Sequence, residues 1–232
     1  MKINRNTIVS LGILIGILAA SGLAFAALAE DLVNHESMSV LDPLFGNWLL
    51  LRTTLTGNRL FSLITFMGNT LIITGGTVLI GFWLAKEKHW SQLQLLLATV
   101  VGAALLNVVL KNIFLRSRPD NPLAFIRATG FSFPSGHAMI SIAFYGVLVF
   151  LIFPNLKSWV GKTLLIIGWI ALFGLIGFSR LYLGVHYLTD VLGGWSAGLM
   201  WLLLCVLMNK LLSKENSGPN HERNQDPGPM PR

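Results

Sequence analysis

A histidine and an aspartate in the last quarter of the chain have a spacing that suits nucleophilic chemistry. His186 and Asp190 are four residues apart, so on a helix they would share one face and the carboxylate could accept a hydrogen bond from one ring nitrogen. That bond would fix the tautomer and leave the other nitrogen free to attack or to take a proton. Because the same spacing arises by chance in many helices, the surrounding residues have to decide its meaning.

Basic residues accompany this pair. Arg180 precedes His186 in the same connection, and Lys111 and Arg118 come at the end of an earlier apolar run. Arg118 comes seven positions after Lys111, which corresponds to about two helical turns and predicts that both side chains project from one face. An isolated Lys or Arg at a membrane border is commonly an interfacial anchor. Three cations near a His–Asp pair instead favour an anion site.

A third group of residues, Pro134, Ser135, Gly136 and His137, opens another apolar run. A Pro and a Ser ahead of a helix, with a Gly that permits close approach, leave backbone N–H groups directed at whatever binds there, so the pattern indicates an anion site. The simpler alternative is a helix start capped by the Ser135 hydroxyl.

These residues must be positioned by helices that cross a membrane. Of the 232 residues, 53% are hydrophobic and 12% are charged, and the mean hydropathy is +0.67, which excludes soluble enzymes. Each span needs about 20 apolar residues and leaves no backbone group unpaired, so the spans must be helical. The sequence predicts an all-α polytopic membrane protein, a bundle of six transmembrane helices with a short interfacial helix between residues 30 and 59. This short helix could equally cap the bundle. The six apolar runs are 7–29, 60–85, 93–110, 138–153, 164–178 and 191–212.

The net charge of +7 is unevenly distributed. By the positive-inside rule, basic residues in alternate connections put both termini in the cytoplasm and the residues discussed above on the extracytoplasmic face. The cytoplasmic set is Lys2, Arg5, Lys86, Lys88, Lys157, Lys162, Lys210, Lys214, Arg223 and Arg232. The opposite face carries more basic residues than topology explains, which indicates a binding role: Arg52, Arg59, Lys111, Arg116, Arg118, Arg127 and Arg180.

The two ends of the chain carry no catalytic pattern. The first apolar run ends in a small-residue pattern at Ala27 and Ala29 that is typical of a secretory signal, but its 23 residues are too many for one, which predicts an uncleaved anchor. Residues 213–232 are polar and contain four Pro, which predicts a disordered cytoplasmic tail after a membrane domain at 1–212. Cys205 is the single cysteine, so no intramolecular disulfide can form.

Taken in order, the three groups of residues resemble the signature of the type 2 phosphatidic acid phosphatase superfamily: Lys-x6-Arg-Pro, then Pro-Ser-Gly-His, then Ser-Arg-x5-His-x3-Asp. Three blocks in order are far more specific than any one of them. Length and layout further resemble the bacterial phosphatidylglycerophosphatase B group, which includes relatives that act on undecaprenyl pyrophosphate. Every position of the signature is matched, by Lys111, Arg118, Pro119, Pro134, Ser135, Gly136, His137, Ser179, Arg180, His186 and Asp190.

The resemblance implies a metal-independent lipid phosphatase in a bacterial cell membrane. His186, oriented by Asp190, would attack phosphorus and form a phosphohistidine, while His137 would protonate the leaving oxygen and then activate water. Neither a metal nor another cofactor is expected, because fixed cations would stabilise the phosphate charge. The phosphate-binding residues would be Lys111, Arg118, Ser135, Gly136 and Arg180.

The resemblance leaves the substrate open among phosphatidylglycerophosphate, phosphatidic acid and undecaprenyl pyrophosphate. The expected partners are this lipid and the bilayer, with no nucleic acid, and the oligomeric state cannot be inferred. Two other classes of function stay open. A transporter would place its charges near the bilayer midplane, whereas here they fall at helix ends. A lipid-binding protein without turnover would have no need of a nucleophile and an acid.

Overall fold

The fold is a bundle of helices. The computed structural model describes residues 5–34, 37–120 and 125–215, and within these ranges every regular element is helical. Six stretches are long and apolar enough to cross a membrane, which confirms the predicted fold class. The elements are α1 (Arg5–Asn34), α2 (Ser37–Leu50), α3 (Leu55–Phe66), α4 (Thr70–Lys86), α5 (Trp90–Phe114), α6 (Gly136–Ile152), the short 3-10 helix η1 (Phe153–Asn155), α7 (Trp159–Tyr182) and α8 (Leu188–Glu215).

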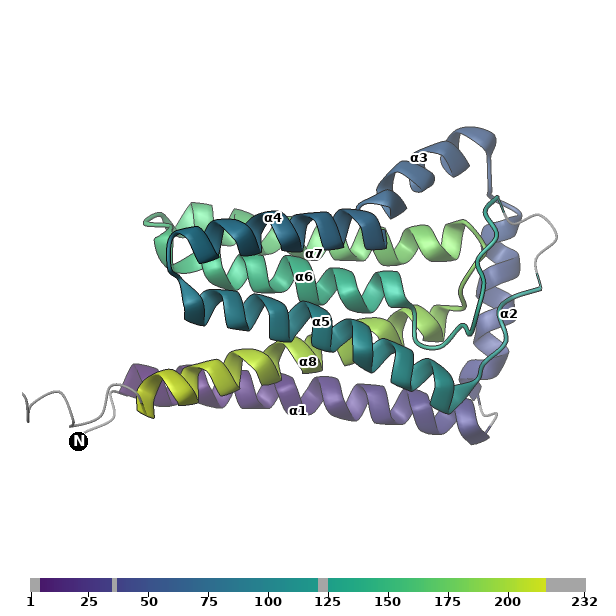
Figure 1. Ribbon diagram of the computed structural model, residues 1–232. Helices are drawn as coiled ribbons and strands as arrows, with labels where there is room; N and C mark the ends of the chain where they lie inside the picture. The colour runs from purple at the N-terminus through teal and green to yellow at the C-terminus, as the bar shows by residue number, and fades with distance from the viewer. Residues whose placement is uncertain (1–4, 35–36, 121–124, 216–232) are drawn as a thin grey trace, which may run out of the picture.

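Helix α6 lies at the centre of the bundle. It contacts α4, α5, α7 and α8, while α1 packs along α8 on the outside (Figure 1). Buried side chains follow most of α6, among them Met139, Ile142 and Val147, whereas the outer helices expose large apolar side chains such as Leu71 and Phe82. An apolar outer surface around a packed centre suits a protein that is surrounded by lipid.

Two glycines let α8 approach α6 closely. A Cβ atom on Gly198 would lie 2.2 Å from Ile142 Cγ2 and 2.5 Å from the Met139 carbonyl oxygen, and one on Gly194 would lie 2.7 Å from the Ser135 carbonyl oxygen. In lipid, small residues four apart are a common means of close helix packing, because apolar side chains gain little by leaving the bilayer. This packing fixes the start of α6 against the start of α8.

The second span differs from the sequence prediction. The apolar run at 60–85 predicts one continuous helix, whereas the span comprises α3 and α4, interrupted at residues 67–69. The Asn69 side chain accepts a hydrogen bond from Leu71 N at 2.9 Å and so begins α4 as its N-cap. A Cβ on Gly68 would lie 2.6 Å from Ile176 Cγ2 and 2.9 Å from Ser141 Oγ. The Asn69 cap and the close approach of Gly68 to α6 and α7 therefore interrupt the helix, although the hydropathy of the segment is continuous.

The other spans extend beyond the apolar runs at their polar ends. Helix α5 continues to Phe114 and so contains Lys111, α7 continues to Tyr182 and contains Arg180, and α8 begins at Leu188 and contains Asp190. Helix α8 also continues to Glu215, past the predicted domain boundary at 212. The rest of the predicted tail, 216–232, lies outside the described residues.

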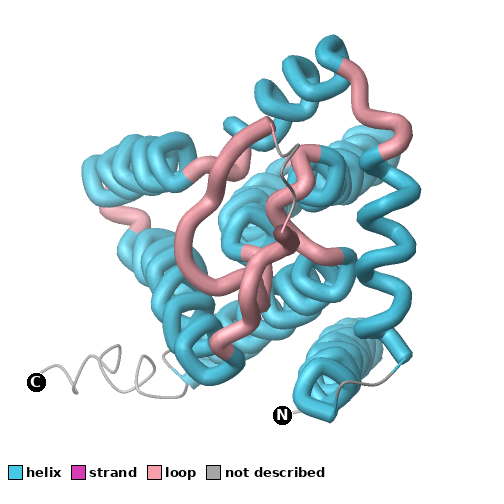
Figure 2. The backbone as a smooth tube through the Cα atoms, turned by 90° about the vertical axis from the view of Figure 1, so that its right-hand side faces the viewer, coloured by secondary structure: helices cyan, strands magenta, loops and turns pink. Residues whose placement is uncertain are grey.

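The predicted short helix in the first long connection is α2, and it covers one end of the bundle. It runs across the ends of the long helices (Figures 1 and 2) and contacts α1, α7 and α8. On its inner side Leu49 is 3% exposed and packs with Ala138, Leu181 and Val191. Helix α2 therefore covers one side of the end of the bundle at which the three sequence blocks lie.

We expect Gly198→Ala to destabilise the protein by about 1–3 kcal/mol, because the added methyl group collides with backbone as well as with a side chain. The matched control is Gly168→Ala in α7, where a Cβ would meet no atom within 4 Å. The measurement is thermal unfolding of the detergent-solubilised variants. Equal midpoints for the two variants would contradict the close packing of α6 and α8.

Candidate active site

The predicted site residues meet at the end of the bundle beneath α2. Loops that follow α5 and α7 cross this end (Figure 2), and they bring the three blocks into contact. The Ser135 N–H donates to the Asp190 carbonyl at 2.9 Å, which joins the second block to the third. Arg118 Nη1 lies 3.2 Å from His186 Nε2, which joins the first block to the third.

His186 and Asp190 form the predicted pair. His186 Nδ1 lies 3.2 Å from Asp190 Oδ2, and both side chains are buried. The prediction that they share a helix face is wrong, because α8 begins at Leu188 and His186 lies in the turn before it. The turn folds back so that Asp190 Oδ2 also accepts the Tyr187 N–H at 2.9 Å. The Asp190 carboxylate thus both orients the His186 ring and caps the start of α8.

The imidazole of His186 is held neutral by its surroundings. Burial lowers the pKa of His186 to about 4; the Asp190 carboxylate opposes this shift, and the charges of Arg180 and Arg118 add to it. At neutral pH the ring therefore keeps an unprotonated nitrogen. With Nδ1 directed at the carboxylate, that nitrogen is Nε2, which faces Arg118. His186 also borders a cavity of about 380 Å³ beneath α2.

Lys111 and Arg118 converge on the loop before α6. Lys111 Nζ donates to the Phe131 carbonyl oxygen, and Arg118 Nη2 donates to the same oxygen at 3.3 Å. Arg118 also donates to the Gly130 and Val185 carbonyls, both at 2.9 Å. The prediction that Lys111 and Arg118 project from one helix face is wrong, because α5 ends at Phe114 and the chain turns at Leu115, which has a φ of 48°. The two cations are nonetheless brought together by their shared carbonyl.

Arg180 reaches the site from α7. Its side chain is buried, and Nη1 donates to Thr65 Oγ1 of α3 at 2.9 Å. Among the described residues, its Nε has no hydrogen-bond partner although it is buried. A buried, unpaired guanidinium donor is costly, so its position indicates a place for an anion.

The start of α6 distinguishes the two hypotheses for Ser135, a helix cap formed by its hydroxyl and an anion site. Ser135 is the N-cap of α6, but its side chain makes no capping hydrogen bond, and the buried Oγ has no partner within the described part of the chain. Gly136 leaves room for Asn107, because a Cβ there would lie 3.0 Å from Asn107 Oδ1. Asn107 Nδ2 in turn donates to the Pro134 carbonyl at 3.2 Å and holds the loop. The hydroxyl and the first amides of the helix are thus available to an acceptor, as an anion site requires.

His137 lies in the first turn of α6, two residues after Ser135. Its ring is within electrostatic reach of Arg180, His186, Arg118 and Lys111. The ring also borders the break between α3 and α4, since a Cβ on Gly68 would lie 3.2 Å from His137 Cδ2. Every residue that the sequence assigned to the site therefore lies at this one end of the bundle.

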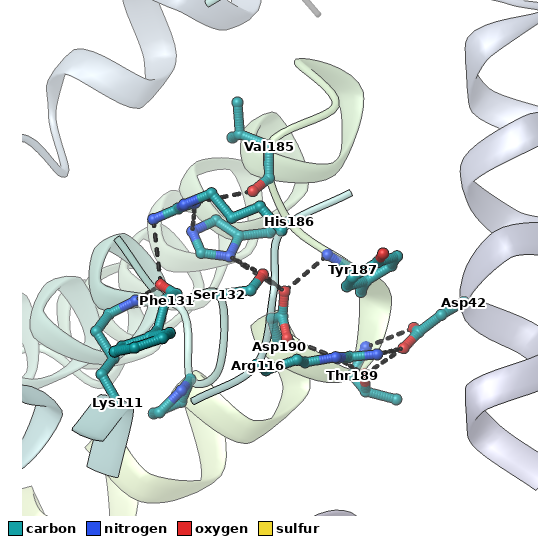
Figure 3. Close-up of polar contacts among 12 residues, drawn as sticks. Asp42, Lys111, Arg116, Phe131, Ser132, Val185, His186, Tyr187, Thr189 and Asp190 are labelled. Carbon is teal, nitrogen blue, oxygen red and sulfur yellow. Dashed lines mark hydrogen bonds and ion pairs between the residues drawn. The ribbon is translucent and has the colours of Figure 1, made fainter. Parts of the chain in front are cut away.

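The structure adds residues that the sequence analysis did not assign to the site (Figure 3). Ser132 Oγ donates to Asp190 Oδ2. Arg116 pairs with both Asp190 and Asp42, at 2.6 Å each. The signal for Arg116 was its membership of the surplus of basic residues on this face, and the signal for Asp42 was an acid inside an apolar stretch.

The chain resembles known proteins in sequence and in fold. Residues 92–213, which include all three blocks, match the family model of the PAP2 superfamily. The chain is 36% identical over 182 residues to phosphatidylglycerophosphatase B of Bacillus subtilis, a match that covers 76% of this chain and 81% of that protein. The chain belongs to the PAP2 superfamily.

Other PAP2 relatives extend the comparison. The crystal structure of a transmembrane PAP2-type phosphatidylglycerolphosphate phosphatase from Bacillus subtilis superposes with a TM-score of 0.75 at 30% identity, covering 84% of this chain and 96% of that one. An undecaprenyl-diphosphatase of Bacillus subtilis, BcrC, is 30% identical over 140 residues, which cover 57% of this chain and 66% of that protein. The family resemblance and the membrane fold are therefore confirmed.

We expect His186 of this PAP2 protein to remain neutral down to about pH 5, since burial lowers its pKa to about 4. Nitrogen chemical shifts of protein labelled at its histidines report the titration, with His186→Gln used to assign the signal. Asp190→Asn should move the midpoint lower still, because the carboxylate favours the charged ring. A midpoint near the ordinary value of about 6.5 would contradict the buried environment.

Proposed function

We propose that this protein is a metal-independent lipid phosphatase that acts through a phosphohistidine. The observation that carries the proposal is the buried His186–Asp190 pair. Nδ1 of the His186 ring lies against the Asp190 carboxylate, and Nε2 faces the Arg118 guanidinium. A neutral imidazole with one nitrogen fixed by a carboxylate is an activated nucleophile. Cations around it would receive the phosphate and stabilise the charge that develops on its oxygens.

In the first step His186 Nε2 attacks phosphorus in line with the leaving oxygen. A P–N bond forms and the P–O bond to the lipid breaks, while His137, which takes up a proton once the negatively charged phosphate is bound beside it, donates that proton to the departing oxygen. Asp190 stabilises the positive charge that the imidazole acquires, as the aspartate of a serine triad does. The phosphate oxygens are held by Lys111, Arg118, Arg180, Ser135 and the Gly136 N–H.

In the second step water replaces the histidine on phosphorus. His137, now neutral, takes a proton from the water as the oxygen attacks, the P–N bond breaks, and inorganic phosphate leaves. His186 is restored as a neutral ring and His137 is restored as an acid. The two steps balance with water as the one co-reactant, so no metal-bound hydroxide is required.

A terminal phosphate on a lipid suits the location of this site. The cations lie at helix ends, where the spans leave the bilayer, so a lipid can keep its chains among the helices while its phosphate reaches them. The three candidate substrates remain phosphatidylglycerophosphate, phosphatidic acid and undecaprenyl pyrophosphate. The match to phosphatidylglycerophosphatase B covers more of both chains than the match to BcrC, which favours phosphatidylglycerophosphate as the first substrate to test.

The alternatives from the sequence receive less support from the site. A protein that only bound lipid would gain nothing from a buried carboxylate that fixes a histidine tautomer, and burying that carboxylate is costly. A transporter would need charges along a path through the bilayer, whereas the clustered charges of the described residues lie at one end of the bundle.

We expect His186→Ala to abolish phosphate release and Asp190→Asn to reduce it by about 10⁴-fold, by analogy with the serine triad. Purified protein is assayed with each of the three lipids while EDTA is present, because the mechanism needs no metal. Radiolabelled substrate should leave an acid-labile, alkali-stable label on the wild-type protein and none on His186→Ala.

The matched control for this experiment is His89→Ala, in the exposed turn between α4 and α5 at the far end of the bundle. It should retain wild-type turnover. Substantial turnover by purified His186→Ala would overturn the assignment of the nucleophile, and a strict magnesium requirement would overturn metal independence.

We also propose that the protein lies in the bacterial cell membrane with both termini in the cytoplasm and the site on the extracytoplasmic face. The support is the charge of the connections: Lys86 and Lys88 lie at the opposite end of the bundle from His186, and the positive-inside rule favours that end for the cytoplasm.

We expect a cysteine at exposed Arg127 to react with a membrane-impermeant thiol reagent in intact cells, and a cysteine at Lys88 to remain unlabelled until the cells are opened. Both are introduced in a Cys205→Ser background, which removes the single native thiol. The reverse pattern would put the site in the cytoplasm.

A further inference from the structure

We infer that Asp42 and Arg116 are positioning residues for His186. They set the orientation of the Asp190 carboxylate, and together with Asp190 they set the net charge beside His186 and so its reactivity. The inference rests on the proposed function, because it concerns the partner of the proposed nucleophile. It adds to that function a contribution from α2, which carries no part of the three sequence blocks.

The geometry begins with a bridge formed by Arg116. Its Nη1 lies 2.6 Å from Asp190 Oδ1 and its Nη2 lies 2.6 Å from Asp42 Oδ2, so one guanidinium joins α2 to the start of α8 (Figure 3). The Asp42 and Asp190 side chains are 1% and 0% exposed, and that of Arg116 is 12% exposed. The guanidinium is also stacked over the Tyr187 ring, 4.2 Å from its centroid. A guanidinium that is paired with two buried carboxylates and stacked on a ring has little freedom to move.

The bridge determines which oxygen of Asp190 faces the histidine. Arg116 occupies Oδ1, while Ser132, the Tyr187 N–H and His186 all share Oδ2. With Oδ1 held, the carboxylate cannot rotate about its Cβ–Cγ bond without losing a charged hydrogen bond. Arg116 therefore keeps Oδ2 directed at His186 Nδ1.

Asp42 holds the same helix start from the other side. Its Oδ1 accepts the Thr189 N–H at 3.0 Å and its Oδ2 accepts the Thr189 hydroxyl at 2.5 Å. A carboxylate at the first turn of a helix pairs with an otherwise free N–H and with the helix dipole. Asp42 thus acts as a cap supplied from a different helix, and it positions the residue next to Asp190.

The charges of this group explain why two carboxylates are needed. If Arg116 paired with Asp190 alone, the two charges would cancel and the cation that forms on His186 during attack would lack a counter-charge. With Asp42 included, two carboxylates and one guanidinium leave a net charge of −1 beside His186. Burial lowers the pKa of Arg116, but the two carboxylates outweigh burial and raise it, so the guanidinium stays charged.

A purely structural role, in which the bridge only fastens α2 to the bundle, predicts a different result. It predicts that loss of either partner has the same effect. A role in the charge of Asp190 predicts opposite effects on the His186 titration, because one variant removes a negative charge and the other a positive one. The charged or titratable groups around His186 include Asp190 of α8, Arg118 and Arg116 after α5, His137 of α6, Arg180 of α7 and, through Arg116, Asp42 of α2. Lys111 of α5 shares the Phe131 carbonyl with Arg118. Tyr187, Tyr182 and Asp120 border the same cavity as His186.

The experiment measures the His186 midpoint by nitrogen chemical shift in the full-length protein, together with phosphate release. We expect Asp42→Asn to lower the midpoint and Arg116→Gln to raise it, each by about half a pH unit to one pH unit. Turnover should fall on the order of 10- to 100-fold in both, the range typical of residues that orient a functional side chain.

The double variant, Asp42→Asn with Arg116→Gln, separates the two accounts. It restores a net charge of −1 from Asp190 alone, so its midpoint should return toward the wild-type value, whereas a structural role predicts a midpoint no closer than that of the single variants. Arg116→Lys keeps the charge without the bidentate bridge, so it should keep the midpoint while losing turnover. Its thermal unfolding and that of the other variants are recorded in parallel.

Equal shifts in one direction for the two single variants, or an unchanged midpoint in Arg116→Gln, would overturn the inference. If a single variant does not fold, the comparison of Arg116→Lys with the double variant still decides it. Because the midpoint does not depend on turnover, a wild-type protein that released no phosphate from any lipid would contradict the proposed function without removing this test.

Discussion

The buried carboxylate of Asp190 is the group on which this end of the molecule depends. A carboxylate with no exposed surface must have all its oxygen lone pairs directed at donors, or its burial would cost several kcal/mol. The donors come from separate parts of the chain: Arg116 after α5, Ser132 before α6, and His186 and Tyr187 before α8. Satisfying one carboxylate therefore folds two loops into one site.

The membrane frame makes that arrangement possible. Close packing of α8 on α6, permitted by Gly194 and Gly198, brings the Asp190 carbonyl within 2.9 Å of the Ser135 N–H. A larger residue at Gly194 would push against the Ser135 carbonyl and so displace the helix start whose amides face the proposed phosphate. The stability of the bundle and the geometry of the site are thus coupled through the same pair of helices.

The charged residues of the site are divided between the two sides of His186, with cations on one side and acids on the other. Cations on Lys111, Arg118 and Arg180 repel one another and are costly to bury, which leaves a site that an anion would stabilise. The acids lie on the other side of His186, where Asp42 and Asp190 compensate Arg116. His186 stands between a region that attracts anions and one that stabilises cations, as the proposed in-line attack on a phosphate would require.

The sequence by itself determined the number of spans and the three blocks, because hydropathy and spacing within a block are local properties. It did not determine the break at Gly68, the turn that holds His186 outside α8, or the bridge from Arg116 to Asp42. Each of these depends on contacts between residues distant in the chain, such as Thr189 with Asp42. The local pattern of hydropathy and residue spacing carries no information on such contacts. Only the tertiary structure could decide them, because a buried charge is satisfied by whichever donors the packed helices bring within reach.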